Sequence, residues 1–440
     1  MFDYGSKEDM SNVFSISCEP PTHQRLNDEA PAPTWVFLEP MAYLADVRNA
    51  TTAAAFSSGG HIVQATVCVT DPLGVSYLCV HYPDLTDADC GRPIIVCSEK
   101  DFLVFSVVFM PVLRGREYFV YKAGLVPSLR LLPDPYPYIH TSSDLGLLPR
   151  DDNDHFVLAA LCYSPTPWVF TLHVFSSRTW VWSCKVMQVE VSSHVRARMP
   201  SILASKVIQF GEGMLGWVDF WTGILFCNVL DEMPMARFIA LPKVMPGNRD
   251  HLKSSLWPVR NVAYNNGMIK FVEVEKHERP DVDERSYDDM DTLYESDCLM
   301  NPKEIGWRAM TWYRMTSWDH WSKGFMVYDK EISVDYPSHS KLLPDLTLGD
   351  TYARELTLKD LLASHPVLSL TCDCDDVVYL LCKSKFCNMK TWLISVDLKK
   401  KTLVDLATFS LEEYFTSVHP SALSKYLNIA PAMEGTSGGQ

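Results

Sequence analysis

Apolar residues run along this chain in short stretches that are rich in Val, Ile, Leu, Phe and Trp and are interrupted by Pro, Gly, Asn and Asp. This pattern predicts β-strands joined by tight turns, because helices need longer stretches with apolar residues three and four apart. The densest example predicts strands in succession at residues 206–210, 214–220, 224–230 and 237–241. Short strands with such tight connections match one antiparallel sheet unit in size, for example a propeller blade.

Turn signals extend this picture along the chain. Asn265, Asn266 and Gly267 give the strongest signal, since Asn-Gly favours a two-residue turn between hairpin strands. We expect an all-β, β-propeller-like fold of about six blades of short antiparallel strands, with five or seven blades as alternatives. A few short peripheral helices are expected at residues 357–364, 410–415 and 422–427. A loop is expected from Pro133 to about residue 154, and a strand at residues 330–334. Predicted hairpins recur at roughly fifty-residue spacing, near Phe119, Phe170, Leu225, Ile269, Met326 and Leu393.

The domain organisation follows from where these patterns begin and end. We expect a disordered N-terminal tail over residues 1–32, a single β-propeller-like domain over 33–428, and a disordered C-terminal tail over 429–440. Within the domain, residues 276–303 form an acidic loop insertion, because eleven carboxylates and three Lys or Arg lie between Glu273 and Asp297.

A glycine pattern in the central region invites a nucleotide-binding interpretation. Gly211, Gly213 and Gly216 spell G-x-G-x-x-G after a predicted strand, and Asp231 follows. A dinucleotide site needs a helix to begin at the last glycine. The residues that follow, 217–223, are mostly aromatic or β-branched and end in glycine, so they are poor helix formers. We therefore expect a plain turn between strands.

The stretch GWVDFWTGILFCNVLDE at residues 216–232, with RFIALP at 237–242, resembles the signature of a plant family that is expanded in grasses, the domain of unknown function 1618 (DUF1618). The resemblance extends over roughly residues 33–428. It implies no catalytic residues, and it implies a domain similar to the propeller-like domains behind plant F-boxes. Two departures are Asn228, where the family usually has aspartate, and the acidic insertion. The structural signature consists of Gly216, Trp217, Asp219, Trp221 and Gly223.

Charge and composition narrow the expected partners. The 440 residues carry a net charge of −15 and no long basic run, so neither nucleic acid nor an anionic membrane is an expected partner. The first residues lack the basic and apolar regions of a secretory signal. The thirteen cysteines, several of them within apolar strands, are expected to be reduced and buried. We expect a monomeric protein that is cytoplasmic, nuclear or both, and not secreted.

Three groups of residues are candidates for a site. Cysteines 372, 374, 382 and 387 are the best metal candidate, but C-x-C-x7-C-x4-C is not a standard zinc spacing, and buried or incidental thiols are the alternative. The acidic insertion is interpreted as a solvated loop, with a calcium site or a docking strip for a basic partner as alternatives. The insertion lacks the glycine and the closing glutamate of an EF-hand. A tryptophan cluster is either a binding surface or blade core. The cluster comprises Trp307, Trp312, Trp318 and Trp321 with His320. The possible partner-binding residues are Trp318, His320, Trp321, Asp288, Asp289 and Asp291.

Motifs for catalysis are missing from the sequence. It contains no G-x-S-x-G, no H-E-x-x-H and no P-loop lysine motif, so we expect no catalytic residue and no cofactor. We predict a non-enzymatic scaffold of β-propeller type that binds a protein partner. The rival interpretation is a hydrolase or lyase with its site in the central channel of the propeller. A third is a degraded member of an expanded family with little activity of its own.

Overall fold

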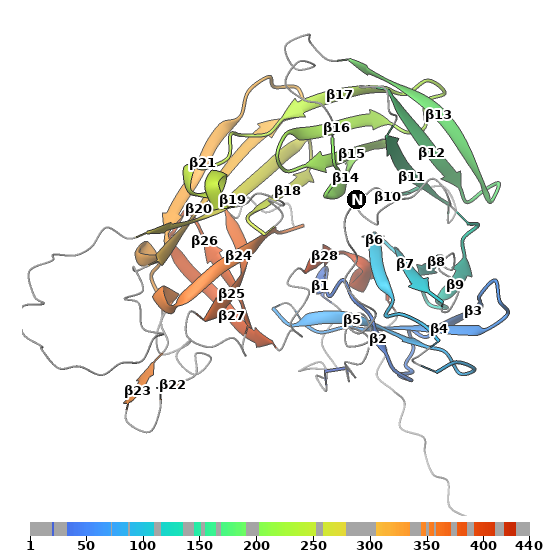
Figure 1. The fold of residues 1–440 in the computed structure, drawn as a ribbon, viewed down its shortest axis with the longest axis horizontal. Coiled ribbons are helices and arrows are strands. Elements are labelled where there is room, and N and C mark those ends of the chain that lie inside the picture. The colour runs from blue at the N-terminus through green and yellow to red at the C-terminus, as the bar shows by residue number, and fades with distance from the viewer. Residues whose placement is uncertain are drawn as a thin grey trace, which may run out of the picture. The chain divides into compact units, whose positions relative to one another are not determined.

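The computed structural model is all-β, as the sequence predicted, and its strands lie in several sheets that are mostly antiparallel (Figure 1). The chain divides into two compact units, residues 1–240 with 412–440 (unit 1) and residues 241–411 (unit 2). The structure describes residues 20–21, 33–71, 73–86, 89–109, 116–134, 145–150, 155–163, 169–190, 202–251, 258–278, 305–334, 345–348, 352–355, 358–370, 376–384, 391–409 and 418–427. The predicted C-terminal tail, the predicted N-terminal tail apart from residues 20–21, and most of the acidic insertion lie outside these residues.

The first sheet of unit 1 combines the two ends of the described chain. Its order is β28-β1-β5-β4-β3, with β2 also paired to β5. Antiparallel pairing of β1 with β28 places Phe37 opposite Pro420. The strands are β1 (Val36–Leu38), β2 (Tyr43–Leu44), β3 (Ala53–Phe56), β4 (Ile62–Cys68), β5 (Val75–His81) and β28 (His419–Ser421).

Two further sheets complete unit 1. One has the order β6-β7-β8-β9, and the other has eight strands in the order β10-β11-β12-β13-β17-β16-β15-β14. The eight-stranded sheet curls into a nearly closed, barrel-like shape: a Cβ on Gly146 of β10 would lie 2.7 Å from Val207 of β14. The strands are β6 (Ile94–Glu99), β7 (Phe102–Val108), β8 (Arg116–Lys122), β9 (Ser128–Leu131), β10 (Leu145–Pro149), β11 (Phe156–Tyr163), β12 (Phe170–Ser176), β13 (Val181–Glu190), β14 (Lys206–Gly211), β15 (Met214–Asp219), β16 (Gly223–Asn228) and β17 (Met235–Ala240).

Unit 2 contains two four-stranded antiparallel sheets, β18-β19-β20-β21 and β24-β25-β26-β27, and a short pair, β22-β23. None of the helices among the described residues has the length and apolarity needed to cross a membrane. The strands are β18 (Arg260–Asn265), β19 (Met268–Glu278), β20 (Ile305–Met315), β21 (Ser322–Tyr328), β22 (Asp345–Leu348), β23 (Tyr352–Glu355), β24 (Leu361–Leu368), β25 (Val377–Ser384), β26 (Thr391–Asp397) and β27 (Thr402–Phe409). The helices within the described ranges are α3 (Pro246–His251), η2 (Asp329–Glu331), η5 (Leu358–Asp360) and η6 (Leu423–Tyr426).

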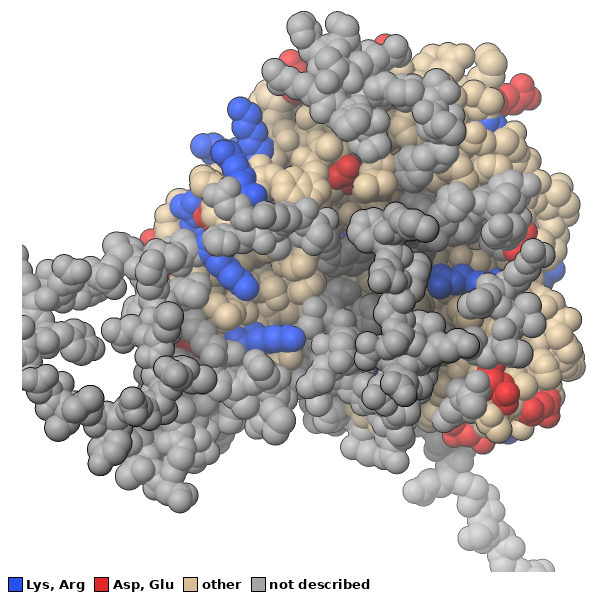
Figure 2. All heavy atoms as spheres, viewed as in Figure 1, with Lys and Arg blue, Asp and Glu red and all other residues tan. Residues whose placement is uncertain are grey.

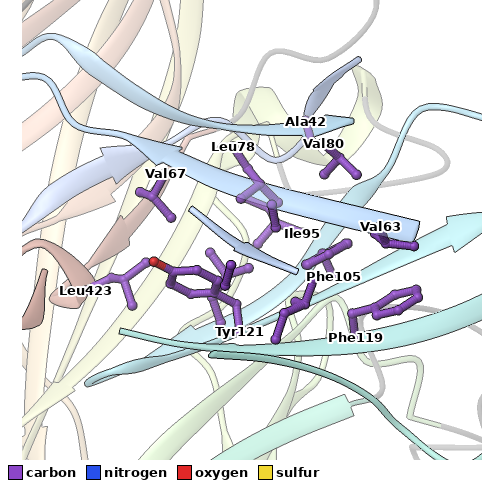
Figure 3. Packing of buried hydrophobic residues seen from close by; sticks show 14 of the residues in the cluster. Ala42, Val63, Val67, Leu78, Val80, Ile95, Phe105, Phe119, Tyr121 and Leu423 are labelled. Carbon is purple, nitrogen blue, oxygen red and sulfur yellow. The ribbon is translucent and has the colours of Figure 1, made fainter. Parts of the chain in front are cut away.

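Apolar cores lie between successive sheets, because many strands are apolar on both faces. In β7, Leu103 and Phe105 pack toward the first sheet, whereas Phe102 and Val104 pack toward β10 and β11. Figure 3 shows the first of these cores, in which Phe105 and Phe119 stack with ring centroids 5.5 Å apart. Side chains alternate between the faces of a strand, so two apolar faces allow each sheet to be packed on both sides.

Two glycine-containing turns confirm predictions from the sequence. Asn266 and Gly267 both have positive φ, 48° and 82°, in the hairpin turn between β18 and β19. Gly211 and Gly213 have φ of 78° and 89° in the turn between β14 and β15, and β15 continues as a strand through Gly216. The G-x-G-x-x-G pattern is therefore a strand connection without the helix that a dinucleotide site requires.

Three predictions about individual elements were wrong. Residues 357–364 were predicted as a helix, but only η5 is helical and β24 follows it, because Leu361 and Ala363 are fully buried against the neighbouring sheet. The loop predicted after Pro133 contains β10, whose apolar residues pair with β11. Residues 330–334 were predicted as a strand but contain η2 and a single bridge at Ser333.

Candidate functional site

The signature residues build the sheet β14–β17. Trp217 is fully buried in the core, and Asp219 accepts hydrogen bonds from the backbone N–H of Trp221 (2.8 Å) and of Leu203 (3.2 Å). A side chain at Gly223 would overlap the carbonyl oxygen of Ile239 on β17. Asn228 likewise accepts a hydrogen bond from the N–H of Leu230 in the following turn. These are structural contacts.

A second structural cluster fixes α3 on the sheet β18–β21. The guanidinium of Arg260 donates to the Glu273 carboxylate at 2.8 Å, and both side chains are fully buried. The other Glu273 oxygen accepts hydrogen bonds from Asn248 (2.8 Å) and from the N–H of Met245 (2.9 Å). Both carboxylate oxygens of Glu273 and the Nε and Nη2 atoms of Arg260 have hydrogen-bond partners, so the pair is compatible with a buried position. Burial lowers the pKa of Arg260, and the charge of Glu273 opposes that shift.

The candidate site is the end of the β20–β21 hairpin. Several large side chains are exposed there, although aromatic and apolar groups gain free energy when they leave water. We call these residues the hairpin surface; Trp318 and His320 lie in the turn, and β21 is the last strand of its sheet. The hairpin surface consists of Tyr313, Trp318, His320, Phe325 and Met326.

Ring contacts hold the turn in one conformation. The rings of Trp318 and His320 stack with centroids 5.6 Å apart and planes 7° apart, and Tyr313 lies 6.2 Å from Trp318. Trp321 turns toward Phe271 (6.0 Å), and the guanidinium of Arg314 lies 5.7 Å from the Trp321 ring. Arg314 also donates to the carbonyl of Trp318. The exposed rings are therefore pre-positioned on a fixed support.

The electrostatic surroundings of the hairpin surface are mixed. Lys323 on β21 and Lys330 on η2 are exposed, although the chain is acidic overall. Figure 2 shows Lys and Arg side chains gathered over the region where Figure 1 places β18 to β21. Within the turn, a hydrogen bond joins His320 Nδ1 to Asp319 Oδ1 at 3.0 Å. This hydrogen bond is the main reason why the pKa of Asp319 is lowered.

The structure brings together only part of the predicted binding group. Trp318 and His320 are exposed and stacked, and Trp321 is half-buried as their support. Trp307 is fully buried between sheets, and Trp312 is 8% exposed, so these two belong to the core. The predicted acidic residues, Asp288, Asp289 and Asp291, lie outside the described residues, beyond the end of β19.

The sequence did not identify Tyr313, Phe325 or Met326 as members of this surface. Phe325 and Met326 are consecutive residues of β21, the last strand of its sheet, so their side chains point to opposite faces, and both are exposed. The hairpin surface therefore extends around both sides of this strand. A bulge between Met310 and Trp312 also changes the register at this point. Sequence periodicity carries no information about which strand forms an edge.

The predicted metal site is described at one of its four positions. Cys382 is fully buried in β25, where burial raises the pKa of its thiol. Cys372, Cys374 and Cys387 lie outside the described residues. Within the described part of the chain, no group of three or more His, Cys, Asp or Glu residues is placed to hold a metal ion.

Titratable groups on terminal strands of the sheets in unit 1 form another candidate. Lys206 begins β14 and His419 begins β28. Burial lowers the pKa of Lys206 to about 8; burial and the nearby charge of Lys206 lower that of His419 to about 4. Glu99, at the end of β6, has its pKa raised by burial to about 7. A neutral imidazole beside an ammonium group with a pKa near neutral could take part in proton transfer.

Comparison with protein-family models gives a match over part of the chain. The family model described as "Protein of unknown function (DUF1618)" matches residues 217–379. No curated protein matches the chain. The match begins at Trp217 in the signature and includes the whole hairpin surface, and the wider resemblance over residues 33–428 stays a prediction. Residues 217–379 of this chain are thus a DUF1618 domain, as the signature predicted.

Proposed function

We propose that this protein is a non-enzymatic interaction scaffold that binds a protein partner through the hairpin surface. The observation that carries the proposal is the exposed, stacked pair of Trp318 and His320 on a turn fixed by Arg314. Tryptophan dominates binding energy at protein interfaces, and a side chain that is already ordered loses little entropy on binding. Lys323 and Lys330 favour a partner surface that carries acidic residues beside apolar ones.

We further propose that the scaffold is a six-bladed β-propeller. Support comes from five successive sets of four antiparallel strands, which are β6–β9, β10–β13, β14–β17, β18–β21 and β24–β27, and from a sixth sheet built from β1, β3–β5 and β28. Pairing of the first strand with the last is a natural way to close a ring of blades. An experimentally determined structure tests this part; six blades around one axis are expected, and two separate sandwiches would contradict it.

Comparative capture tests the interaction. The tagged full chain, a Trp318→Ala/His320→Ala variant and a Trp221→Ala variant are each incubated with extract of the source tissue, and captured proteins are quantified by mass spectrometry. Trp221 is 42% exposed and lies outside the hairpin surface, so it is a matched control. We expect one or more proteins to be captured by the wild type and the control, and at least ten-fold less by the double variant (about 1.4 kcal/mol per factor of ten).

A further arm separates the hairpin surface from the acidic insertion. Residues 279–304 follow β19 and precede β20, and a Gly-Ser linker replaces them in this arm. If the linker variant still captures the partner, the hairpin surface is supported as the interface. If the linker variant loses the partner and the Trp318→Ala/His320→Ala variant captures it fully, the interface lies in the insertion. Equal capture by all four proteins contradicts both locations.

Lys206 and His419 favour a second candidate function, a hydrolase or lyase acting in the proposed central channel. The observation in its favour is the effect of the Lys206 charge on the pKa of His419; both side chains are partly buried. Turnover of a metabolite library by the wild type, lost in Lys206→Met and in His419→Gln but kept in Trp318→Ala, would support it. An activity that survives both substitutions would place the chemistry elsewhere.

A further inference from the structure

Two thiols meet on one face of the first sheet. Strands β4 and β5 pair in a register that places Cys68 opposite Tyr77 and Thr66 opposite Cys79. Cys68 and Cys79 are therefore diagonal neighbours whose side chains point to the same face. Both are free thiols, and they share a cluster with Tyr43 and Tyr77.

The two cysteines also pack together. Cys79 belongs to a small buried cluster with Tyr43 and Tyr77, and the partly buried Cys68 packs against this cluster. Cys79 is 1% exposed, whereas Cys68 is only partly buried and is the last residue of β4. A small oxidant therefore reaches Cys68 first, and the strand end is where the backbone adapts most easily when the sulfurs approach bonding distance.

We propose that Cys68 and Cys79 form a reversible redox pair, in which hydroperoxides oxidise Cys68 and Cys79 closes a disulfide that joins β4 to β5. In the first step the Cys68 thiolate attacks one peroxide oxygen, the O–O bond breaks, and the departing hydroxide takes a proton to become water. Cys68 is left as a sulfenic acid. In the second step the Cys79 sulfur attacks the Cys68 sulfur, the S–O bond breaks, and the hydroxide leaves with the Cys79 proton as water. Two thiols lose two electrons, and hydrogen peroxide is reduced to two waters.

The two thiols are suited to different roles. Hydrogen bonding from Cys79 lowers the pKa of Cys68, and the thiolate is the form that attacks a peroxide. The pKa of Cys79 is raised, chiefly by its hydrogen bond to Cys68 and then by burial, so Cys79 stays a thiol until the sulfenic acid forms beside it. Cys382, which is buried and whose pKa is raised by burial alone, is the contrasting case.

Peptide mapping of the full-length protein tests the proposal. The reduced chain is treated with a small excess of hydrogen peroxide, free thiols are alkylated, and the digest is analysed by mass spectrometry. We expect the disulfide-linked Cys68–Cys79 peptides to become the most abundant cross-linked pair, and dithiothreitol to restore both alkylated peptides. Cys184, an exposed thiol on β13, reports whether the oxidant reached the protein.

Two variants define each role. In Cys79→Ser we expect no disulfide and a several-fold larger yield of Cys68 sulfenic acid trapped by dimedone, because the resolving thiol is missing. Cys382→Ser is the control and should form the Cys68–Cys79 pair as the wild type does. The proposal would be overturned if Cys68 and Cys79 of the wild type remain fully alkylated under conditions that oxidise Cys184. This test needs only the wild-type protein, so it stands even if a variant fails to fold.

Discussion

At the scale of single residues, the buried Arg260–Glu273 pair carries a large cost of removing charges from water. Its two charges are removed from water and depend on each other and on Asn248 for compensation. Replacing a buried pair with apolar residues is often tolerated, but leaving one charge without its partner is costly. The pair also connects β18 to β19, and through Asn248 it holds α3 in place.

This pair gives a stability prediction. Glu273→Gln should lower the free energy of unfolding by about 3–5 kcal/mol, because the Arg260 charge stays buried without a countercharge. Urea denaturation followed by tryptophan fluorescence measures the change. The control is Lys401→Met, which breaks a partly exposed pair with Glu331 at 3.1 Å and should cost about 1 kcal/mol or less. An equal decrease in the free energy of unfolding in both variants would show that burial does not determine the cost of breaking an ion pair.

Gly223 in the signature gives a second stability prediction. A methyl group there would overlap the Ile239 carbonyl and the Phe238 ring, and a backbone atom within a sheet cannot move aside. Gly223→Ala should therefore lower the unfolding free energy by about 1–3 kcal/mol. Gly91→Ala is the control, since its Cβ would meet nothing closer than 3.7 Å. A neutral Gly223→Ala would mean that the signature glycine has a role other than close packing.

Glu99 gives a pH-dependence prediction. Burial raises its pKa in the folded state to about 7, above the value of 4.5 for an exposed glutamate. The folded protein thus holds this proton more tightly than the unfolded chain, and the stabilisation is complete below pH 4.5 and lost as the pH rises to 7. Glutamine does not ionise, so Glu99→Gln does not lose this stabilisation as the pH rises. The unfolding free energy of Glu99→Gln minus that of the wild type should therefore increase by up to roughly 3 kcal/mol between pH 4.5 and pH 8.

The measurement is the unfolding free energy of both proteins at several pH values. Because His419 has its pKa lowered to about 4, its contribution changes in the opposite direction, falling as the pH falls below the ordinary histidine value of 6.5. His365, whose pKa burial also lowers to about 4, acts in the same direction as His419. The wild-type profile alone therefore mixes opposing effects, and the difference between Glu99→Gln and wild type isolates the effect of Glu99. A difference that is constant with pH would contradict the assigned pKa.

At the scale of elements, sequence pattern predicted hairpins well and elements with mixed signals poorly. The Asn266-Gly267 turn and the strands around Trp217 were predicted, because turn chemistry and apolar runs are local properties. Residues 357–364 were predicted as a helix, because a Pro at 366 and a possible cap at 357 are also local signals. Packing of Leu361 and Ala363 between two sheets decided the outcome, and packing partners are not visible in the sequence.

The candidate site shows the same limit. The sequence located Trp318 and His320, because polar and aromatic residues crowd a predicted turn. It did not separate them from Trp307 and Trp312, whose burial depends on the facing sheet. The Cys68–Cys79 contact likewise depends on the register between two strands, which apolar patterning alone does not fix to the residue.

At the scale of the whole molecule, the chain forms a series of packed sheets and exposes the aromatic hairpin surface beside one of them. Successive sheets share apolar cores within each unit, so their strand faces are occupied by packing and the edges and turns remain for recognition. The hairpin surface is such a place, at the end of a last strand in the DUF1618 domain. We therefore expect partner binding to depend on this hairpin and not on the buried signature residues.

Site-specific photo-crosslinking tests this central claim most directly. A photo-reactive phenylalanine analogue replaces Phe325 in the hairpin surface in one protein, and Val126, which is 88% exposed in unit 1, in a matched control. After illumination in source extract, we predict a covalent adduct between the position-325 protein and a protein that the wild-type chain also captures, with no such adduct from position 126. A captured partner that crosslinks from position 126 and not from position 325 would contradict the account.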